Sequence, residues 1–187
     1  LYSIHHFNMN LPNWLTTLRI FLVPPLVVVL LTEFEGSEPI ALAIFLLAAI
    51  TDWFDGYLAR KRNQITLLGK FLDPIADKLL IASVFISLVE MKVVPAWMVV
   101  VIIGREIAVT GFRAIAASHG HNIPAGVSGK IKMVTEVVTI TLLIGRKYLG
   151  SFVFLSRIAL WITLIVAVLS AVDYYFKFGR IFLLKKI

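Results

Sequence analysis

Long apolar segments follow one another through this chain of 187 residues, and they restrict its possible folds more than any other feature. Apolar residues make up 59% of the sequence, charged residues only 16%, and the mean hydropathy is +0.92. A soluble domain normally carries more charge than this. Because a membrane-spanning helix needs roughly 20 residues, we expect an all-α integral membrane protein with six transmembrane helices.

The six spans are expected at residues 15–31, 40–60, 71–89, 95–117, 131–149 and 152–176, within a single domain formed by residues 9–187. Residues 1–8 match nothing that follows, and we expect a vector-derived remnant or a disordered N-terminus before a start at Met9. No apolar stretch stays free of charge for 18 residues, so charged side chains inside the spans are candidates for function. Counting Lys and Arg places both termini in the cytoplasm.

Four aspartates interrupt one of the apolar regions. Asp52 and Asp55 are three residues apart, and Asp73 and Asp77 are four apart, so each pair shares one face of a helix. Gathered in a medium of low dielectric constant, four carboxylates would repel one another strongly or take up protons unless cations bind between them. Oxygen ligands of this kind suit Mg²⁺ or Mn²⁺. A purely structural alternative pairs these acids with nearby cations, namely Arg60, Lys61, Arg62, Lys70 and Lys78.

The residues around the acids complete a longer pattern, D-x-x-D-G-x-x-A-R-x8-G-x3-D-x3-D. Gly56 and Ala59 leave space beside the acids, and Arg60 carries a guanidinium that fits a phosphate. The pattern resembles the signature of the CDP-alcohol phosphotransferases, integral membrane enzymes that make phospholipids. The resemblance implies that two Mg²⁺ or Mn²⁺ ions bind the aspartates and that Asp77 is the general base. It also implies four contacts to a CDP-lipid, made by Gly56, Ala59, Arg60 and Gly69.

A second group of charged residues lies further along the chain. Arg105 and Arg113 are eight residues apart, roughly two helical turns, so we expect both on the same face of a helix. Glu106 is placed to pair with an arginine or to orient it. Lys130 and Lys132 open the next span. If both helices face the aspartates, these cations form a pocket suited to a phosphorylated alcohol. Anchoring near anionic lipid head groups is the alternative for the lysines.

Arg19, one turn inside the first span, fits either a phosphate contact or snorkelling to the membrane interface. The sequences M-N-L-P-N-x-L-T-x-x-R at 9–19, G-R-E-I-A-V-T-G-F-R at 104–113 and S-G-K-x-K at 128–132 resemble the branch of the family that makes phosphatidylglycerophosphate. That resemblance implies CDP-diacylglycerol and sn-glycerol 3-phosphate as substrates. It also implies CMP as the leaving product and a homodimer in the cytoplasmic membrane, with its active site at the cytoplasmic face.

Two other functions stay open at this stage. A related transferase with another acceptor, such as inositol phosphate, would carry the same aspartates. A divalent-cation transporter would also need acids in the membrane, but it would leave Gly56, Ala59, Arg60 and Gly69 without a purpose. Nucleic acid is not expected as a partner, because the net charge of +7 is explained by basic loops beside anionic lipid.

Overall fold

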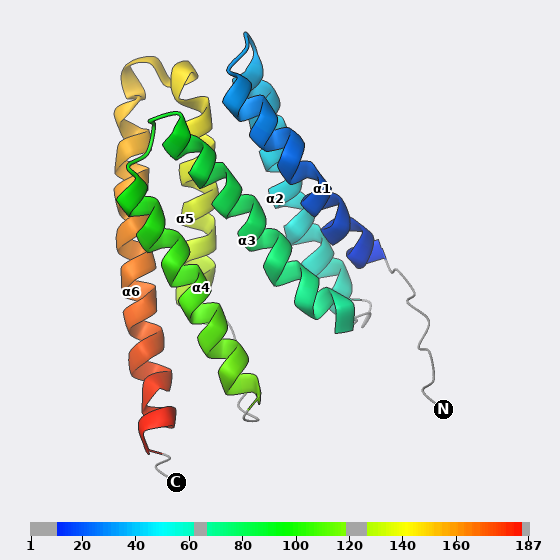
Figure 1. Ribbon diagram of the computed structural model, residues 1–187, viewed down its shortest axis with the longest axis vertical. Helices are drawn as coiled ribbons and strands as arrows, with labels where there is room; N and C mark the ends of the chain where they lie inside the picture. The colour runs from blue at the N-terminus through cyan, green and yellow to red at the C-terminus, as the bar shows by residue number, and fades with distance from the viewer. Residues whose placement is uncertain (1–10, 62–66, 119–126, 185–187) are drawn as a thin grey trace. The chain divides into compact units, whose positions relative to one another are not determined.

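The computed structural model describes residues 11–61, 67–118 and 127–184, and within these ranges it is helical apart from short turns, with no strand. Side chains are not described at 11–12, 52–61, 67–68, 70–71, 127–128 and 177–184. The elements are α1 (Leu11–Thr32), α2 (Ser37–Lys61), α3 (Leu67–Glu90), α4 (Ala96–Ser118), α5 (Val127–Ile144), the 3-10 helix η1 (Gly145–Phe152) and α6 (Phe154–Leu184) (Figure 1). The expected remnant at 1–8 lies outside the described residues.

Each of the six predicted spans corresponds to one α-helix, although some ends differ. The fifth helix ends at Ile144, five residues before the predicted end at 149, and the chain continues as η1. The sixth extends past residue 176 to Leu184. By length and composition, two of the described helices, Asn13–Thr32 and Phe154–Phe176, are apolar enough to cross a membrane. Charges inside the other helices, such as those of α4, lower their hydropathy.

Contacts divide the chain into two compact units, Leu1–Val84 and Phe85–Ile187. In the first, a tight turn makes α1 and α2 antiparallel neighbours (Figure 1). The Ser37 amide donates to the Phe34 carbonyl at 2.9 Å, and Gly36 has φ +87°, a left-handed conformation that glycine adopts without strain. This short connection forces the chain to fold back along α1.

The α1–α2 contact is built from one apolar stripe on each helix. Leu26 and Leu30 of α1 are buried, and so are Ala41, Phe45 and Ala48 of α2. The α2 residues recur at spacings of four and three, which places them on one face of the helix. Two alanines on this face let the two backbones approach closely, as small residues do between membrane helices.

In the second unit, α6 packs against both α5 and α4. The turn from η1 into α6 uses Gly150, whose φ is +50°, and the Val153 amide donates to the Gly150 carbonyl at 3.3 Å. Between α5 and α6, the buried hydroxyls of Thr139 and Thr163 lie 2.8 Å apart. Because Thr163 donates its proton to the Thr135 carbonyl at 3.1 Å, Thr139 is the donor between the two hydroxyls.

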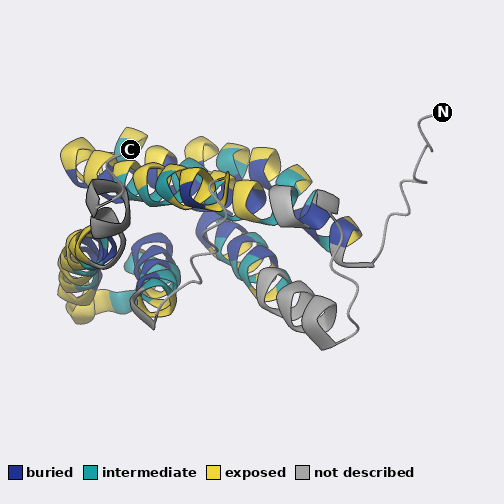
Figure 2. Cartoon of the chain, turned by 90° about the horizontal axis from the view of Figure 1, so that it is seen from below, coloured by how far each residue is buried: buried dark blue, intermediate teal, exposed yellow. Residues whose placement is uncertain are grey.

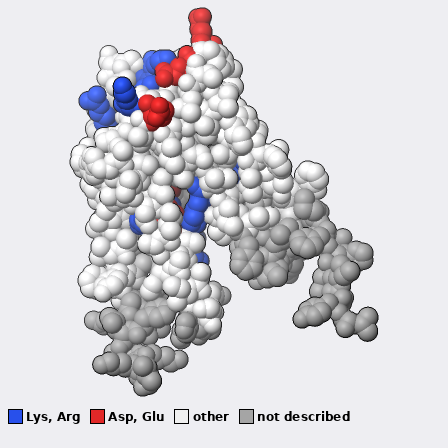
Figure 3. Space-filling view, viewed as in Figure 1, with Lys and Arg blue, Asp and Glu red and all other residues white. Residues whose placement is uncertain are grey.

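The outer helix surfaces are apolar. Along α6, Trp161, Ile165, Leu169 and Phe176 are each more than half exposed, although a soluble protein would bury side chains of this size. Figure 2 shows that single helices carry exposed residues on one side and buried residues on another. On the face in Figure 3, the described helix sides are largely free of Lys, Arg, Asp and Glu. Exposed apolar side chains along a helix are typical of a surface that contacts lipid or another protein.

Candidate functional site

The first acidic pair lies in the same helical register as the buried stripe of α2. Asp52 and Asp55 follow Ala48 by four and seven residues, so they occupy the same helical register as the residues that pack on α1. Their side chains are outside the described part of the chain, as are those of the predicted CDP-lipid contacts of α2, at positions 56, 59 and 60. Along the chain, both aspartates follow the α1–α2 turn by about as many residues as the first residues of α1 precede it. In an antiparallel pair of helices, the backbone of α2 therefore reaches the level of the start of α1 at these positions.

The corresponding part of α1 is polar and buried. Asn13, Thr16 and Arg19 are at most 3% exposed, whereas the same stripe nearer the turn carries Leu26 and Leu30. Both helices therefore change from apolar to polar at the same end of the antiparallel pair. A buried guanidinium at this level supports a role for Arg19 inside the site, because a side chain that snorkels to the interface keeps its charged end in water.

The second acidic pair reaches this end through α3. The Thr16 hydroxyl donates a hydrogen bond of 2.5 Å to Oδ1 of Asp73. Asp77 follows one turn later, and both aspartates are only partly buried residues. Gly69, one turn before Asp73, is buried. The structure thus brings Asp73 to the polar part of α1, at the end of the unit that also holds positions 52 and 55.

The donor set fits a hard divalent cation. Asp73 and Asp77 are carboxylates one helical turn apart, and the Thr16 bond uses one lone pair of Asp73. Within the described side chains, no three acidic, His or Cys residues form a metal-binding group. Two of the four predicted ligands, Asp52 and Asp55, are outside that set. The predicted two-ion centre therefore stays a prediction.

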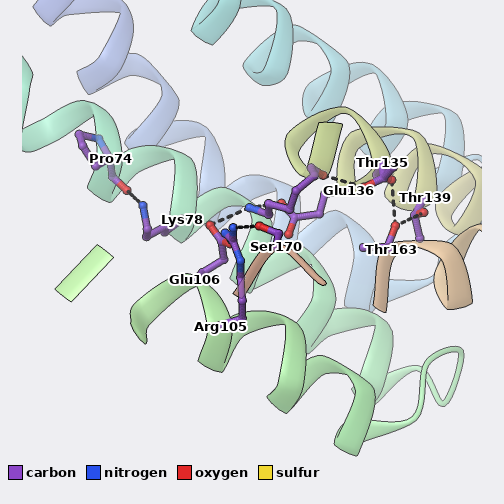
Figure 4. A network of polar contacts seen from close by, with 10 residues as sticks. Pro74, Lys78, Arg105, Glu106, Thr135, Glu136, Thr139, Thr163 and Ser170 are labelled. Carbon is purple, nitrogen blue, oxygen red and sulfur yellow. Dashed lines mark hydrogen bonds and ion pairs between the residues drawn. The ribbon is translucent and has the colours of Figure 1, made fainter. Parts of the chain in front are cut away.

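A separate charged network lies in the second unit, between α4 and α5. Glu106 accepts from Arg105 and forms an ion pair of 2.6 Å with the Lys132 ammonium, which also pairs with Glu136 at 2.7 Å (Figure 4). The side chains of Arg105, Glu106, Lys132 and Glu136 are 7%, 13%, 6% and 2% exposed. Charges as deeply buried as these need partners, and each of the four has one.

α6 supplies further contacts to Arg105. One guanidinium nitrogen donates to the Ser170 hydroxyl (Figure 4), and the guanidinium carbon lies 6.0 Å from the centre of the Tyr174 ring. Nε of Arg105 is buried and has no hydrogen-bond partner among the described residues. The guanidinium is therefore fixed on several sides and keeps one donor available in the interior of the unit.

The network changes the predicted picture of a cationic pocket. Arg105 and Lys132 are buried, but Glu106 and Glu136 balance their charges. Arg113 and Lys130, which the sequence analysis grouped with them, are exposed. Arg113 is eight residues from Arg105, and eight residues of α-helix turn through about 80° beyond two full turns, which explains why the two arginines differ in burial.

Sequence reasoning missed two hydroxyl side chains that the structure joins to charged groups. Thr16 bonds Asp73 and Ser170 accepts from Arg105, across 57 and 65 residues of sequence. Each is a polar residue on the buried stripe of an apolar helix. This signal was present in the sequence, but it does not tell which distant residue such a hydroxyl contacts.

Residues 9–169 match the CDP-alcohol phosphatidyltransferase family. A Bacillus subtilis (strain 168) protein named CDP-diacylglycerol–glycerol-3-phosphate 3-phosphatidyltransferase is 42% identical, over 90% of this chain and 94% of its own length. Proteins of the same name from Salmonella choleraesuis (strain SC-B67) and Rickettsia felis are 37% and 34% identical, over 87% and 89% of this chain. The matched region spans 94% of the Salmonella protein and 93% of the Rickettsia protein.

Proposed function

The chain belongs to the CDP-alcohol phosphatidyltransferase family, and on that basis we propose that it transfers the phosphatidyl group of CDP-diacylglycerol to sn-glycerol 3-phosphate. A hydroxyl oxygen of glycerol 3-phosphate attacks the phosphorus that carries diacylglycerol, and a new P–O bond forms. The P–O bond to CMP breaks, CMP leaves, and the hydroxyl proton passes to a base. The products are phosphatidylglycerophosphate and CMP. This chain matches three relatives over almost the whole of their lengths, and the names of those relatives support this reaction.

Asp52, Asp55, Asp73 and Asp77 are the proposed ligands of two Mg²⁺ or Mn²⁺ ions. Bound there, the ions would neutralise the diphosphate and stabilise the developing charge on the leaving group. Two features of the structure support the assignment. Positions 52 and 55 of α2 lie at the same end of the α1–α2 pair as the polar part of α1, and the Thr16 hydrogen bond holds Asp73 at this end. The family match, which covers all four aspartates, supports it as well.

Asp77 is the proposed base that takes the acceptor's proton. It lies one turn from Asp73 on α3 and is only partly buried, and a carboxylate is a residue type that can act as a general base. In the proposed site, Arg60 binds the phosphates of the CDP-lipid. Gly56, Ala59 and Gly69 leave room for its nucleotide.

Arg105 and Lys132 are the proposed ligands of the acceptor phosphate. The observation that carries this part of the proposal is that both cations are buried inside a helical unit. Arginine and lysine are the usual ligands of a phosphate monoester, whereas inositol carries no charge for them to bind. Nε of Arg105 offers a donor that no described residue uses. Arg19, Arg113 and Lys130 are further proposed phosphate contacts.

We also propose that all six long helices cross the membrane and that the aspartates lie at its cytoplasmic face. The apolar outer surface of α6 supports insertion, and the distribution of Lys and Arg supports this orientation. A homodimer in the cytoplasmic membrane is proposed from the family resemblance alone.

Release of CMP tests the proposed function. Purified protein in detergent receives CDP-diacylglycerol and Mg²⁺, and then glycerol 3-phosphate, inositol phosphate, inositol or serine in separate reactions. We expect CMP only with glycerol 3-phosphate. Asp77→Asn should lower turnover by at least ~100-fold, the usual contribution of a general base. Glu90→Gln is the matched control, because Glu90 is an exposed acid on the same helix, and it should keep full turnover.

The alternatives predict other results. Turnover with inositol phosphate would be consistent with the proposed aspartate site, but it would overturn the proposal that glycerol 3-phosphate is the acceptor. If no acceptor released CMP from folded protein that binds Mg²⁺, the transferase assignment would fail and a cation transporter would be the remaining candidate.

A further inference from the structure

Thr16 connects α1 to the second acidic pair. Its side chain is fully buried, and its hydroxyl donates to Oδ1 of Asp73 at 2.5 Å across 57 residues of sequence. The acceptor is a carboxylate, and hydrogen bonds to charged acceptors are shorter and roughly twice as strong as neutral ones. The bond therefore holds the carboxylate of a proposed metal ligand in one orientation.

Other threonines in these helices make a different contact. The hydroxyls of Thr17, Thr32, Thr51 and Thr141 donate to the backbone carbonyl three or four residues earlier, at 2.8 Å in each case. This is the ordinary local bond of a threonine within a helix. Among the described threonines, Thr16 is the one whose hydroxyl reaches a carboxylate on another helix. Such a contact is not needed to keep a helix together.

We propose that Thr16 is a positioning residue for Asp73, and that it tunes the affinity of the acidic site for a divalent cation. This inference rests on the proposed function, because it takes Asp73 as a metal ligand. A carboxylate has about four lone-pair positions, and the Thr16 bond occupies one of them at Oδ1. With that oxygen fixed, the remaining lone pairs keep a constant direction and the metal does not have to order the side chain as it binds.

A structural role for Thr16 would have a different consequence. If the hydroxyl served only to join α1 to α3, its removal would lower the stability of the protein without changing the affinity for metal in the folded fraction. Partners that orient metal ligands behave otherwise, since their loss typically weakens metal affinity by about 10- to 100-fold. Metal affinity of folded protein therefore separates the two roles without any measurement of activity.

The experiment measures Mn²⁺ binding to purified protein in detergent, with free Mn²⁺ followed by electron paramagnetic resonance and no substrate present. Thr16→Val removes the hydroxyl at nearly constant volume and should weaken binding by at least ~10-fold. Thr16→Ser keeps a hydroxyl and should restore affinity to near the wild-type value. Thr17→Val is the matched control: it changes the neighbouring residue, whose hydroxyl bonds only a local carbonyl, and should leave affinity unchanged.

Circular dichroism confirms that each variant is folded, and Thr16→Ala is the second variant if Thr16→Val does not fold. Equal Mn²⁺ affinity in the wild type and in the variant that lacks the hydroxyl would overturn the inference, as would a wild-type protein that binds no Mn²⁺. If Mn²⁺ binding depends on Thr16 but no acceptor yields CMP, the inference holds and the proposed function fails.

Discussion

Glu106 joins the two buried cations of the second unit, and its substitution gives a large and measurable change in stability. The carboxylate accepts from Arg105 and pairs with Lys132 at 2.6 Å, with all three side chains at most 13% exposed. Glu106→Gln keeps the size of the side chain but removes its charge. The buried network then changes from two cations and two carboxylates to two cations and one carboxylate.

Removing one partner of a buried ion pair costs roughly 3–5 kcal/mol, because the other charge stays in the interior without compensation. The amide of glutamine keeps one polar contact, so we expect a loss of about 3 kcal/mol. For a chain of this length, this corresponds to a thermal midpoint about 10 °C lower. The assay is thermal unfolding in detergent, followed by circular dichroism.

Two further variants make this result specific. Glu90→Gln removes an exposed acid from the same unit and should change the free energy of unfolding by less than about 0.5 kcal/mol. Lys132→Met, combined with Glu106→Gln, removes one charge of each sign. The double variant should therefore lose less stability than the two single variants added together. A Glu106→Gln midpoint equal to that of Glu90→Gln, or strict additivity, would refute the reasoning.

Two other predictions concern the second unit. Thr163→Val should lower the stability by about 1–3 kcal/mol, because it leaves the buried Thr139 hydroxyl without its acceptor. Thr141→Val, which removes only a local bond, should cost less in the same unfolding assay. Gly150→Ala should lower the stability by about 1–3 kcal/mol, because φ +50° with ψ −121° strains a residue that has a Cβ. Gly145→Ala should be close to neutral, since Gly145 has no positive φ and open space around its Cβ position; equal effects would contradict the role of backbone strain.

The helices could be predicted because long apolar segments separated by short polar turns favour a helix for each segment. Their ends were harder to predict. The basic residues after position 176 resemble a membrane boundary, yet Lys and Arg are good helix formers, and α6 continues to Leu184. The fifth span was expected to reach residue 149, but the chain leaves the α-helix at Gly145, a residue with low helix propensity.

The site was predictable to the extent that it depends on spacing within one helix. Asp73 and Asp77 are one turn apart on α3, as their spacing requires, and Asp52 and Asp55 take the register of the buried α2 stripe. Contacts between helices did not follow from spacing. The pairing of Lys132 with Glu106 and the bond from Thr16 to Asp73 depend on how helices pack, and periodicity within a segment carries no information on that.

The identity of the lipid product tests the central claim most directly. The protein is incubated with CDP-diacylglycerol, Mg²⁺ and sn-glycerol 3-phosphate labelled with ¹³C in its glycerol carbons, and the lipids are analysed by mass spectrometry. We predict that phosphatidylglycerophosphate carries the label and that one molecule of it forms for each molecule of CMP released. CMP accompanied by unlabelled phosphatidic acid would mean that water is the acceptor, and it would contradict the account.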